Sequence, residues 1–257
     1  MVGRASALLS RGVATPRAAA FAVLAVGLVA YYAAHENVVD LSKWWDVAFL
    51  ALCLIPAIFA LVYLALPFRN AQGLFLLALA LLVLTVLLEL ADLDSLSSFS
   101  KLALMTALGF WFLEYFESVL WVACIALVIP FVDAFSVWRG PTGHIVEEEP
   151  GFFDRVAFAF PHPGEPSAAL LGPPDLLFFA LFLAAAARWR LRVGWTWVAL
   201  TLSLGLTLLI GATWESAGLP ALPGLAFGFL IPNADLLWRE FQKWRGERGR
   251  EQAVSSG

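Results

Sequence analysis

The sequence predicts an all-α protein, a polytopic transmembrane helical bundle of about eight spans. Of its 257 residues, 61% are hydrophobic and only 14% are charged, whereas an ordinary soluble domain is about half apolar and about a quarter charged. The apolar residues lie in long runs bounded by charged residues and tryptophans, a pattern typical of helices that face lipid. These runs cover roughly residues 18–34, 46–67, 72–90, 101–116, 118–138, 175–189, 194–214 and 219–238.

Most of the runs approach the roughly 20 residues that a helix needs to cross the hydrocarbon core. The run at 101–116 is short, and its boundary with the run at 118–138 is blurred. The run at 18–34 begins too deep in the chain, and is followed by too many others, to be a cleaved signal peptide.

The basic residues predict the orientation of the spans. With eight spans, twelve of the 16 Lys and Arg residues fall on one side, in the N-terminal segment, at Arg69, in the turn 188–192 and in the C-terminal tail. The positive-inside rule then places both termini in the cytoplasm. A ninth span would put the last two basic clusters on opposite sides, so the charges favour eight.

This topology divides the chain into three regions. Residues 1–116 form four N-terminal spans, residues 117–240 hold the candidate site, and residues 241–257 form a cytoplasmic tail. The longest connection, 139–172, lies on the non-cytoplasmic side. Its apolar stretch 156–160 is expected to be an interfacial strand or a loop packed on the membrane surface.

Several classes of site find no support in the sequence. The two cysteines, Cys53 and Cys124, lie singly in apolar runs and form neither a disulfide framework nor a CxxC metal motif. The three histidines lack metal-ligand spacing. Neither a nucleotide-binding glycine loop nor a basic nucleic-acid face is visible. We therefore expect no metal, no cofactor and no nucleic-acid partner.

Two aspartates stand out because of where they lie in their spans. Asp133 lies inside the run 118–138, where a charged side chain costs roughly 2.5–3.5 kcal/mol at the helix centre. Taken alone, it is equally well read as a snorkelling or helix-packing residue. Asp175 follows Gly172-Pro173-Pro174 at the start of the next run. Taken alone, it is better read as an acidic residue stabilising a helix N-terminus.

Taken together, the two aspartates suggest a catalytic pair. Their runs are consecutive and antiparallel, so both carboxyl groups are expected at similar depth on the same side, and the last run also starts there. Two carboxyl groups in an apolar cleft cannot easily both ionise, so such a pair shares a proton. One can then act as general base on a water while the other polarises a carbonyl. Because the pair titrates as a unit, neither residue receives a fixed role.

The segment Leu219-Pro220-Ala221-Leu222-Pro223 opens the last run. Its two prolines remove backbone donors and favour an extended chain. Extended backbone beside the aspartates is expected to pair with an extended substrate strand. The alternative reading is a helix-start motif without a function.

These three segments resemble the presenilin and signal peptide peptidase family of intramembrane aspartyl proteases. Val132-Asp133 corresponds to the family's Tyr-Asp motif, Gly172-Pro173-Pro174-Asp175 to its Gly-x-Gly-Asp motif, and Pro220-Ala221-Leu222 to its Pro-Ala-Leu motif. The residues that follow Asp133 are similar to those of archaeal presenilin-like proteins. The resemblance covers about residues 118–238. Val132 and Pro174 depart from the motifs, and one span fewer than the family's usual nine is visible. The predicted orientation is similar to that of signal peptide peptidase and opposite to that of presenilin.

The resemblance implies an intramembrane aspartic endopeptidase that cleaves transmembrane or signal-peptide-like helices in a prokaryotic cytoplasmic membrane. It implies that Asp133 and Asp175 are the catalytic dyad, and that Gly172 and the Pro220–Pro223 segment bind substrate. The partners would be membrane-embedded protein substrates and the lipid bilayer. A catalytically inactive presenilin-like protein that binds transmembrane helices is the alternative, with Pro174 as its sign. A transporter or another membrane enzyme is the third reading, although few polar residues lie mid-span. A prepilin peptidase lacks support because paired CxxC motifs are absent.

Overall fold

The computed structural model describes residues 2–139, 155–214 and 220–255, with side chains described for residues 16–136, 155–214 and 220–247. In the described residues the long regular elements are all helices, and the strands form a single two-stranded sheet. The predicted all-α class is therefore confirmed. Most helices lie at the predicted apolar runs.

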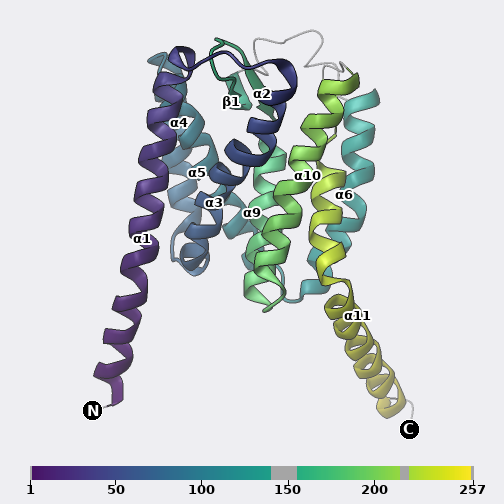
Figure 1. Cartoon of the computed structure of the whole chain (residues 1–257). Coiled ribbons are helices and arrows are strands. Elements are labelled where there is room, and N and C mark those ends of the chain that lie inside the picture. Colours follow the sequence, from purple (N-terminus) through teal and green to yellow (C-terminus); the bar gives the residue numbers. More distant parts are fainter. Residues whose placement is uncertain (1, 140–154, 215–219, 256–257) are drawn as a thin grey trace.

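The helices run alternately up and down through the bundle (Figure 1). Helix α1 (Val2–Ala34) rises to the end of the bundle where the two strands lie, which we call the hairpin end, and α11 (Leu222–Ser255) returns to the opposite end. The start of α1 and the end of α11 therefore lie on the same side, which we call the terminal end. Between them come α2 (Lys43–Phe49), α3 (Ile55–Ala65), α4 (Leu74–Leu90), α5 (Asp94–Phe112), α6 (Val119–Arg139), α9 (Pro173–Arg188) and α10 (Val193–Trp214).

Short turns join or interrupt these helices: the 3-10 turns η1 (His35–Asn37), η3 (Leu66–Asn70) and η4 (Leu113–Tyr115), and the π-helical turn η2 (Leu50–Leu54) between α2 and α3. Pro56 is the second residue of α3, and only Ile55 separates it from the π turn. Because proline has no N–H and crowds the carbonyl one turn earlier, the wider π turn lets the helix continue through it.

Five described helical segments are long and apolar enough to cross a membrane: Pro16–Asn37, Lys43–Asn70, Asp94–Tyr115, Val119–Ser136 and Val193–Trp214. The shorter α4 is also apolar, and many of its leucines and valines point outward, such as Leu76 at 68% and Leu87 at 57% exposed. A broad apolar surface of this kind suits lipid rather than water. The fold is thus that of a membrane protein, while the count of eight spans stays a prediction.

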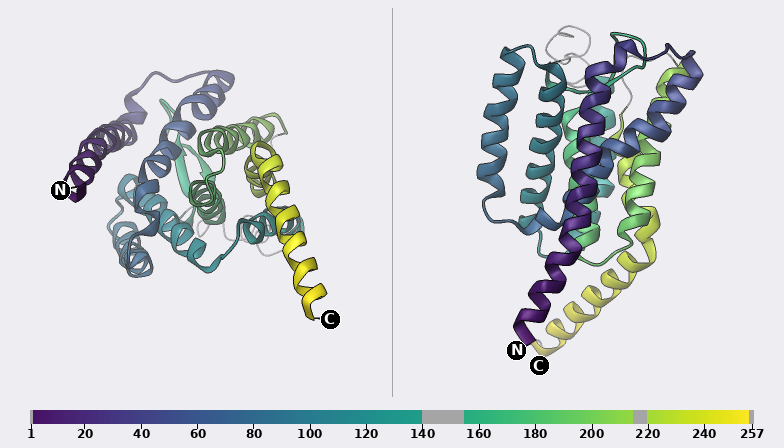
Figure 2. Two further views of the ribbon diagram at one scale, coloured as in Figure 1. Left: turned by 90° about the horizontal axis from the view of Figure 1, so that it is seen from below. Right: turned by 60° about the vertical axis from the view of Figure 1, so that its left-hand side comes forward.

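Helix α9 forms the centre of the bundle. Its residues 179–186 are fully buried, and α5, α10 and α11 pack around it. A close approach is at Gly109 of α5, where an added Cβ would lie 2.7 Å from the carbonyl oxygen of Leu177. Only glycine lets the two backbones come this near. Figure 2 shows this helix enclosed by the others when the bundle is viewed from below.

Small residues also bring α11 onto α10. An added Cβ at Gly224 would lie 3.2 Å from the Cβ of Ser203, and one at Gly228 would lie 3.1 Å from the backbone of Ala199. Glycines spaced four apart lie on one face of a helix, and this close packing is a common way for membrane helices to associate.

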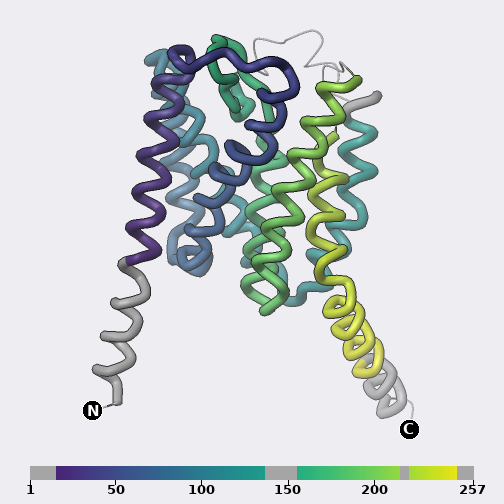
Figure 3. The backbone as a smooth tube through the Cα atoms, viewed as in Figure 1, coloured from purple at the N-terminus to yellow at the C-terminus, as the bar shows by residue number. Residues whose placement is uncertain are grey.

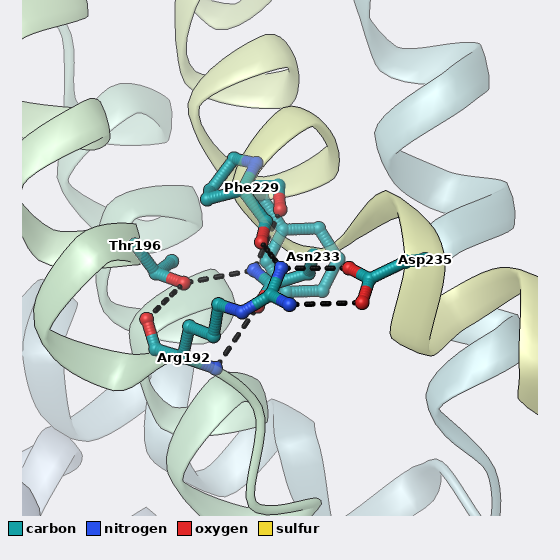
Figure 4. Close-up of polar contacts among 6 residues, drawn as sticks. Arg192, Thr196, Phe229, Asn233 and Asp235 are labelled. Carbon is teal, nitrogen blue, oxygen red and sulfur yellow. Dashed lines mark hydrogen bonds and ion pairs between the residues drawn. The ribbon is translucent and has the colours of Figure 1, made fainter.

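A buried polar cluster fastens the same two helices near the terminal end (Figure 4). The Asn233 side chain, which is fully buried, donates to Thr196 Oγ1 and to the carbonyl of Phe229, both at 2.8 Å. Its oxygen accepts the backbone N–H of Arg192 at 3.0 Å, and the Arg192 guanidinium pairs with Asp235. Every polar atom of the Asn233 amide group therefore has a partner.

The C-terminal part of α11 bends away from the bundle (Figure 3), and Pro232 lies inside this helix. A proline inside a helix removes one backbone hydrogen bond and crowds the preceding turn, which accounts for the bend. The helix continues to Ser255, so the segment 241–257 predicted as a tail is helical as far as that residue.

The loop 139–172 contains a β-hairpin that the sequence predicts only in part. Strand β1 (Phe158–Pro161) pairs antiparallel with β2 (Ala168–Leu171), with Phe158 opposite Leu171. The stretch 156–160 does include a strand, but Phe158 is fully buried and Phe160 is 3% exposed. The strand therefore packs into the end of the bundle rather than on the membrane surface. Residues 140–154 lie outside the described part of the chain.

Candidate functional site

Asp133 lies in the last part of α6 and is partly buried. Its Oδ2 accepts the backbone N–H of Leu222, the first residue of α11, at 3.1 Å. The first N–H groups of a helix have no partner within the helix, and the helix dipole favours a negative charge there. Asp133 therefore stabilises the start of α11 from a different helix.

Asp175 lies in the first turn of α9, after the prolines at the first two helical positions. Its N–H donates to the carbonyl of Gly172 at 3.1 Å, and the backbone of Gly172 also forms a hydrogen bond with its carboxyl group. A Cβ at Gly172 would lie 3.2 Å from Oδ2 of Asp175. The glycine thus leaves room for the carboxyl group to fold back over the turn.

The structure brings Asp133 and Asp175 to the same end of the bundle, close enough for their charges to interact. Their helices are not simple neighbours, however. Helix α11 packs along α6 and also contacts α9, whereas α6 and α9 touch each other only slightly. The start of α11 therefore completes the group, as the sequence predicts from its depth.

The Pro220–Pro223 segment is more enclosed than expected. The side chains of Ala221 and Leu222 are buried, and Pro220 and Pro223 are partly buried. Two of these four residues have no N–H, and that of Leu222 is bonded to Asp133. Only the N–H of Ala221 is left in this segment. The segment can therefore donate fewer hydrogen bonds to a substrate strand than an ordinary extended segment of the same length could. Leu219 lies outside the described residues.

The sequence does not single out Lys101 and Glu89, which form an ion pair at the hairpin end between a buried lysine and a partly buried glutamate. Lys101 Nζ lies 2.8 Å from Glu89 Oε1 and donates to the carbonyl of Ala157 at 3.1 Å. The sequence predicts Lys101 at the start of the apolar run 101–116, and therefore at the end of a helix. Helix α5 begins earlier, at Asp94, so Lys101 lies within it. The serine-rich stretch 95–100 before it was the available signal of a polar helix face.

Metal binding finds no site among the described residues, where no three His, Cys, Asp or Glu side chains gather around a common point. Two cavities, of about 700 Å³ at the terminal end and about 400 Å³ at the hairpin end, are lined by neither aspartate. Beside Asp133 on α6, Phe131, Val132 and Phe135 are more than half exposed. Asp133 thus lies near an exposed apolar surface, and neither aspartate lines either cavity.

Comparison with protein-family models finds no match. Comparisons with curated proteins and with solved structures find none either.

Proposed function

We propose that this chain is an intramembrane aspartyl protease of the presenilin and signal peptide peptidase type, with Asp133 and Asp175 as its dyad. The observation that carries the proposal is the convergence of both aspartates and the start of α11 at one end of the bundle. These three elements are far apart in the chain. A purely structural account explains Asp133 and the start of α11 by their hydrogen bond, but it needs a separate reason for Asp175. A shared role in peptide hydrolysis supplies one reason for all three.

The chemistry needs only the dyad and a water molecule. The ionised carboxyl group takes a proton from the water, whose oxygen attacks the carbonyl carbon of the peptide bond. The protonated carboxyl group hydrogen-bonds to the carbonyl oxygen and gives it its proton, which produces a tetrahedral diol. The diol collapses as the C–N bond breaks: the amine nitrogen takes the proton that one carboxyl group holds, and a diol hydroxyl gives its proton to the other, which leaves a carboxyl product and restores the dyad. Either aspartate can begin in either state, because the pair holds its proton jointly.

A helical substrate must be extended before attack, because its carbonyls are engaged in its own hydrogen bonds. Strand β2 supports this step, since it ends at Leu171, four residues before Asp175. Leu170 is the most exposed residue of β2, at 39%. An extended segment added beside β2 would run toward the dyad and gain main-chain hydrogen bonds. Together with Gly172 and the Pro220–Pro223 segment, this strand forms the proposed substrate-binding surface.

A second candidate is a protein that binds membrane helices without cleaving them. Two observations favour it: Pro174 precedes Asp175, and the Asp133 carboxyl group is already engaged by Leu222. Proline fixes φ where a glycine would leave the backbone free. Under this reading, Asp133 is a helix cap and Asp175 a first-turn carboxylate.

The experiment that tests the proposal measures cleavage of a single-span substrate in liposomes. Asp133→Asn and Asp175→Asn should each abolish cleavage, because an amide cannot transfer the dyad's proton. Both variants should stay folded, because the amide oxygen of Asp133→Asn still accepts the N–H of Leu222 and that of Asp175→Asn still accepts the N–H of Gly172. Pro174→Gly should preserve or raise the rate. If the wild type and Pro174→Gly are both inert across several substrates yet retain them in pull-downs, the binding-only reading replaces the protease.

We further propose that the terminal end faces the cytoplasm of a prokaryotic cell. The start of α1, the turn 188–192 and the end of α11 lie at this end and carry most of the chain's basic residues. The positive-inside rule supports this orientation. The dyad would then lie near the opposite surface of the membrane.

A further inference from the structure

The outer side of strand β1 is covered by three side chains from the N-terminal half of the chain. Lys101 Nζ donates to the carbonyl of Ala157 at 3.1 Å. The hydroxyl groups of Tyr32 and Tyr31 donate to the carbonyls of Ala159 at 2.6 Å and Pro161 at 2.8 Å. The three acceptors are alternate residues, and alternate residues of a strand turn their carbonyls to the same side.

These carbonyls point away from β2. Phe158 lies opposite Leu171 and Phe160 opposite Ala169, and the same ladder continues with the N–H of His162 donating to the carbonyl of Ser167 at 3.0 Å. Even-numbered residues of β1 therefore bond to β2, and odd-numbered residues face outward. Pro161 has no N–H to offer on that outer side. The edge of β1 is thus fastened to α1 and α5, while the outer edge of β2 has no neighbouring strand in the described sheet.

Burying Lys101 costs more free energy than burying either tyrosine, because its side chain carries a charge. It is 7% exposed, and its charge is balanced by Glu89, which also accepts a hydrogen bond from Ser97. A buried ion pair is often no more stabilising than apolar residues of similar volume. Simple packing of α4 on α5 therefore does not account for it. Its ammonium group does what no apolar side chain can do there, because it binds the backbone where the chain enters β1.

We propose that Lys101, held by Glu89, is a positioning residue for the Asp133/Asp175 site, an inference that rests on the proposed function. It fixes the start of β1, and β1 fixes β2 through the ladder. Strand β2 continues through Gly172 into the turn that carries Asp175. Lys101 takes no part in proton transfer. Its effect is to set the position of β2, and of a substrate segment paired with it, relative to Asp175.

This role predicts a particular kinetic signature. A loosened hairpin presents the same surface to substrate but holds the scissile bond less accurately. We therefore expect kcat to fall about 10–100-fold with a smaller change in KM, since misplacement by about 1 Å costs a reaction roughly that much. Cleavage should also spread to neighbouring peptide bonds, which a loss of stability alone does not cause.

The main test uses the double variant Lys101→Met/Glu89→Gln, which removes both charges and leaves neither one buried alone. The single variant Lys101→Arg keeps a cationic donor. It should therefore retain much of the wild-type rate and the single cleavage position. Lys243→Met is the matched control, because Lys243 pairs with Glu240 on an exposed part of α11 far from the hairpin. It should behave like the wild type.

A second readout needs no protease activity. In a Cys53→Ser/Cys124→Ser background, Ala157→Cys places a thiol at a position that is fully buried. The rate of maleimide labelling should rise about tenfold when Lys101→Met/Glu89→Gln is added, because the hairpin is released. Lys243→Met should leave that rate unchanged.

The outcomes separate the two proposals. Reduced kcat, scattered cleavage and faster labelling in the double variant support the positioning role. A wild type that cleaves, with a double variant that matches it in kcat and cleavage position, overturns the role and leaves the protease proposal standing. A loss of activity that only follows the unfolded fraction, or unchanged labelling of Ala157→Cys, also overturns it. A wild type that cleaves nothing overturns both proposals.

Discussion

Gly109→Ala is the substitution whose effect the structure predicts most directly. The added methyl group would lie 2.7 Å from the carbonyl oxygen of Leu177, 3.0 Å from the Cβ of Ala180 and 3.1 Å from the N atom of Leu181. Two of these three atoms belong to the backbone of α9, which cannot rotate aside as a flexible side chain can. Helices α5 and α9 must therefore separate.

The size of the effect follows from these distances. An ordinary contact between heavy atoms is about 3.5 Å, so the Cβ and the Leu177 oxygen must move about 0.8 Å apart. Overpacking of this kind costs about 1–3 kcal/mol, against a gain of about 0.5–1 kcal/mol from replacing glycine in a helix. The net loss is therefore up to about 2.5 kcal/mol, which lowers Tm by up to about 10 °C in a chain of this size. Leu177 lies two residues after Asp175, so we also expect kcat to fall more than the folded fraction does.

The assay is thermal unfolding in detergent together with cleavage in liposomes, with Gly27→Ala as the matched control. Gly27 also lies in a helix, but an added Cβ there would meet no atom within 4 Å. Gly27→Ala should therefore leave Tm unchanged or raise it slightly. If Gly109→Ala is as stable as Gly27→Ala, the close packing of α5 on α9 is wrong.

Two further predictions concern α11 and the topology. Asn233→Leu should lower the free energy of unfolding by about 1–2 kcal/mol, measured by denaturation in mixed micelles, because the N–H of Arg192 loses its partner; the exposed Asn37→Leu should change it less. A reporter that works only in the cytoplasm should be active when fused to the C-terminus and inactive when inserted in the loop 139–172, and the reverse pattern would invert the orientation.

The sequence predicts the helical class and the approximate course of most helices because lipid-facing helices leave a strong compositional signal. Runs such as 72–90 and 194–214 need little tertiary information, since each is apolar along most of its length. The order of passes also determines which residues share an end of the bundle. Asp133 and Asp175 could therefore be predicted to lie at similar depth before any contact was known.

Contacts between helices could not be predicted in the same way. Whether α6 packs mainly on α9 or on α11 depends on side-chain shape. The order of the spans suggested α9, which follows α6 in the predicted topology, but α6 packs mainly on α11. The bond from Leu222 to Asp133 follows from that packing, and it engages an N–H that the extended segment was expected to offer to substrate.

The second strand of the hairpin was missed for a related reason. Strand β2 is Ala168-Ala169-Leu170-Leu171, which has neither β-branched residues nor alternating polarity. It becomes a strand because β1 pairs with it, and β1 is held by Tyr31, Tyr32 and Lys101 from helices over 50 residues away in the chain. Such long-range hydrogen bonds leave no local pattern in the sequence.

The central claim is that Asp133 and Asp175 together activate a water molecule that hydrolyses a membrane-embedded peptide bond. The most direct measurement is mass spectrometry of the products that the purified protein forms from a single-span substrate in liposomes made with ¹⁸O-labelled water. We predict that the wild type forms a new C-terminal carboxyl group that carries ¹⁸O. Asp133→Asn and Asp175→Asn, although folded, should form that product about a thousandfold more slowly or not at all. Labelled product from either variant at the wild-type rate would contradict the dyad.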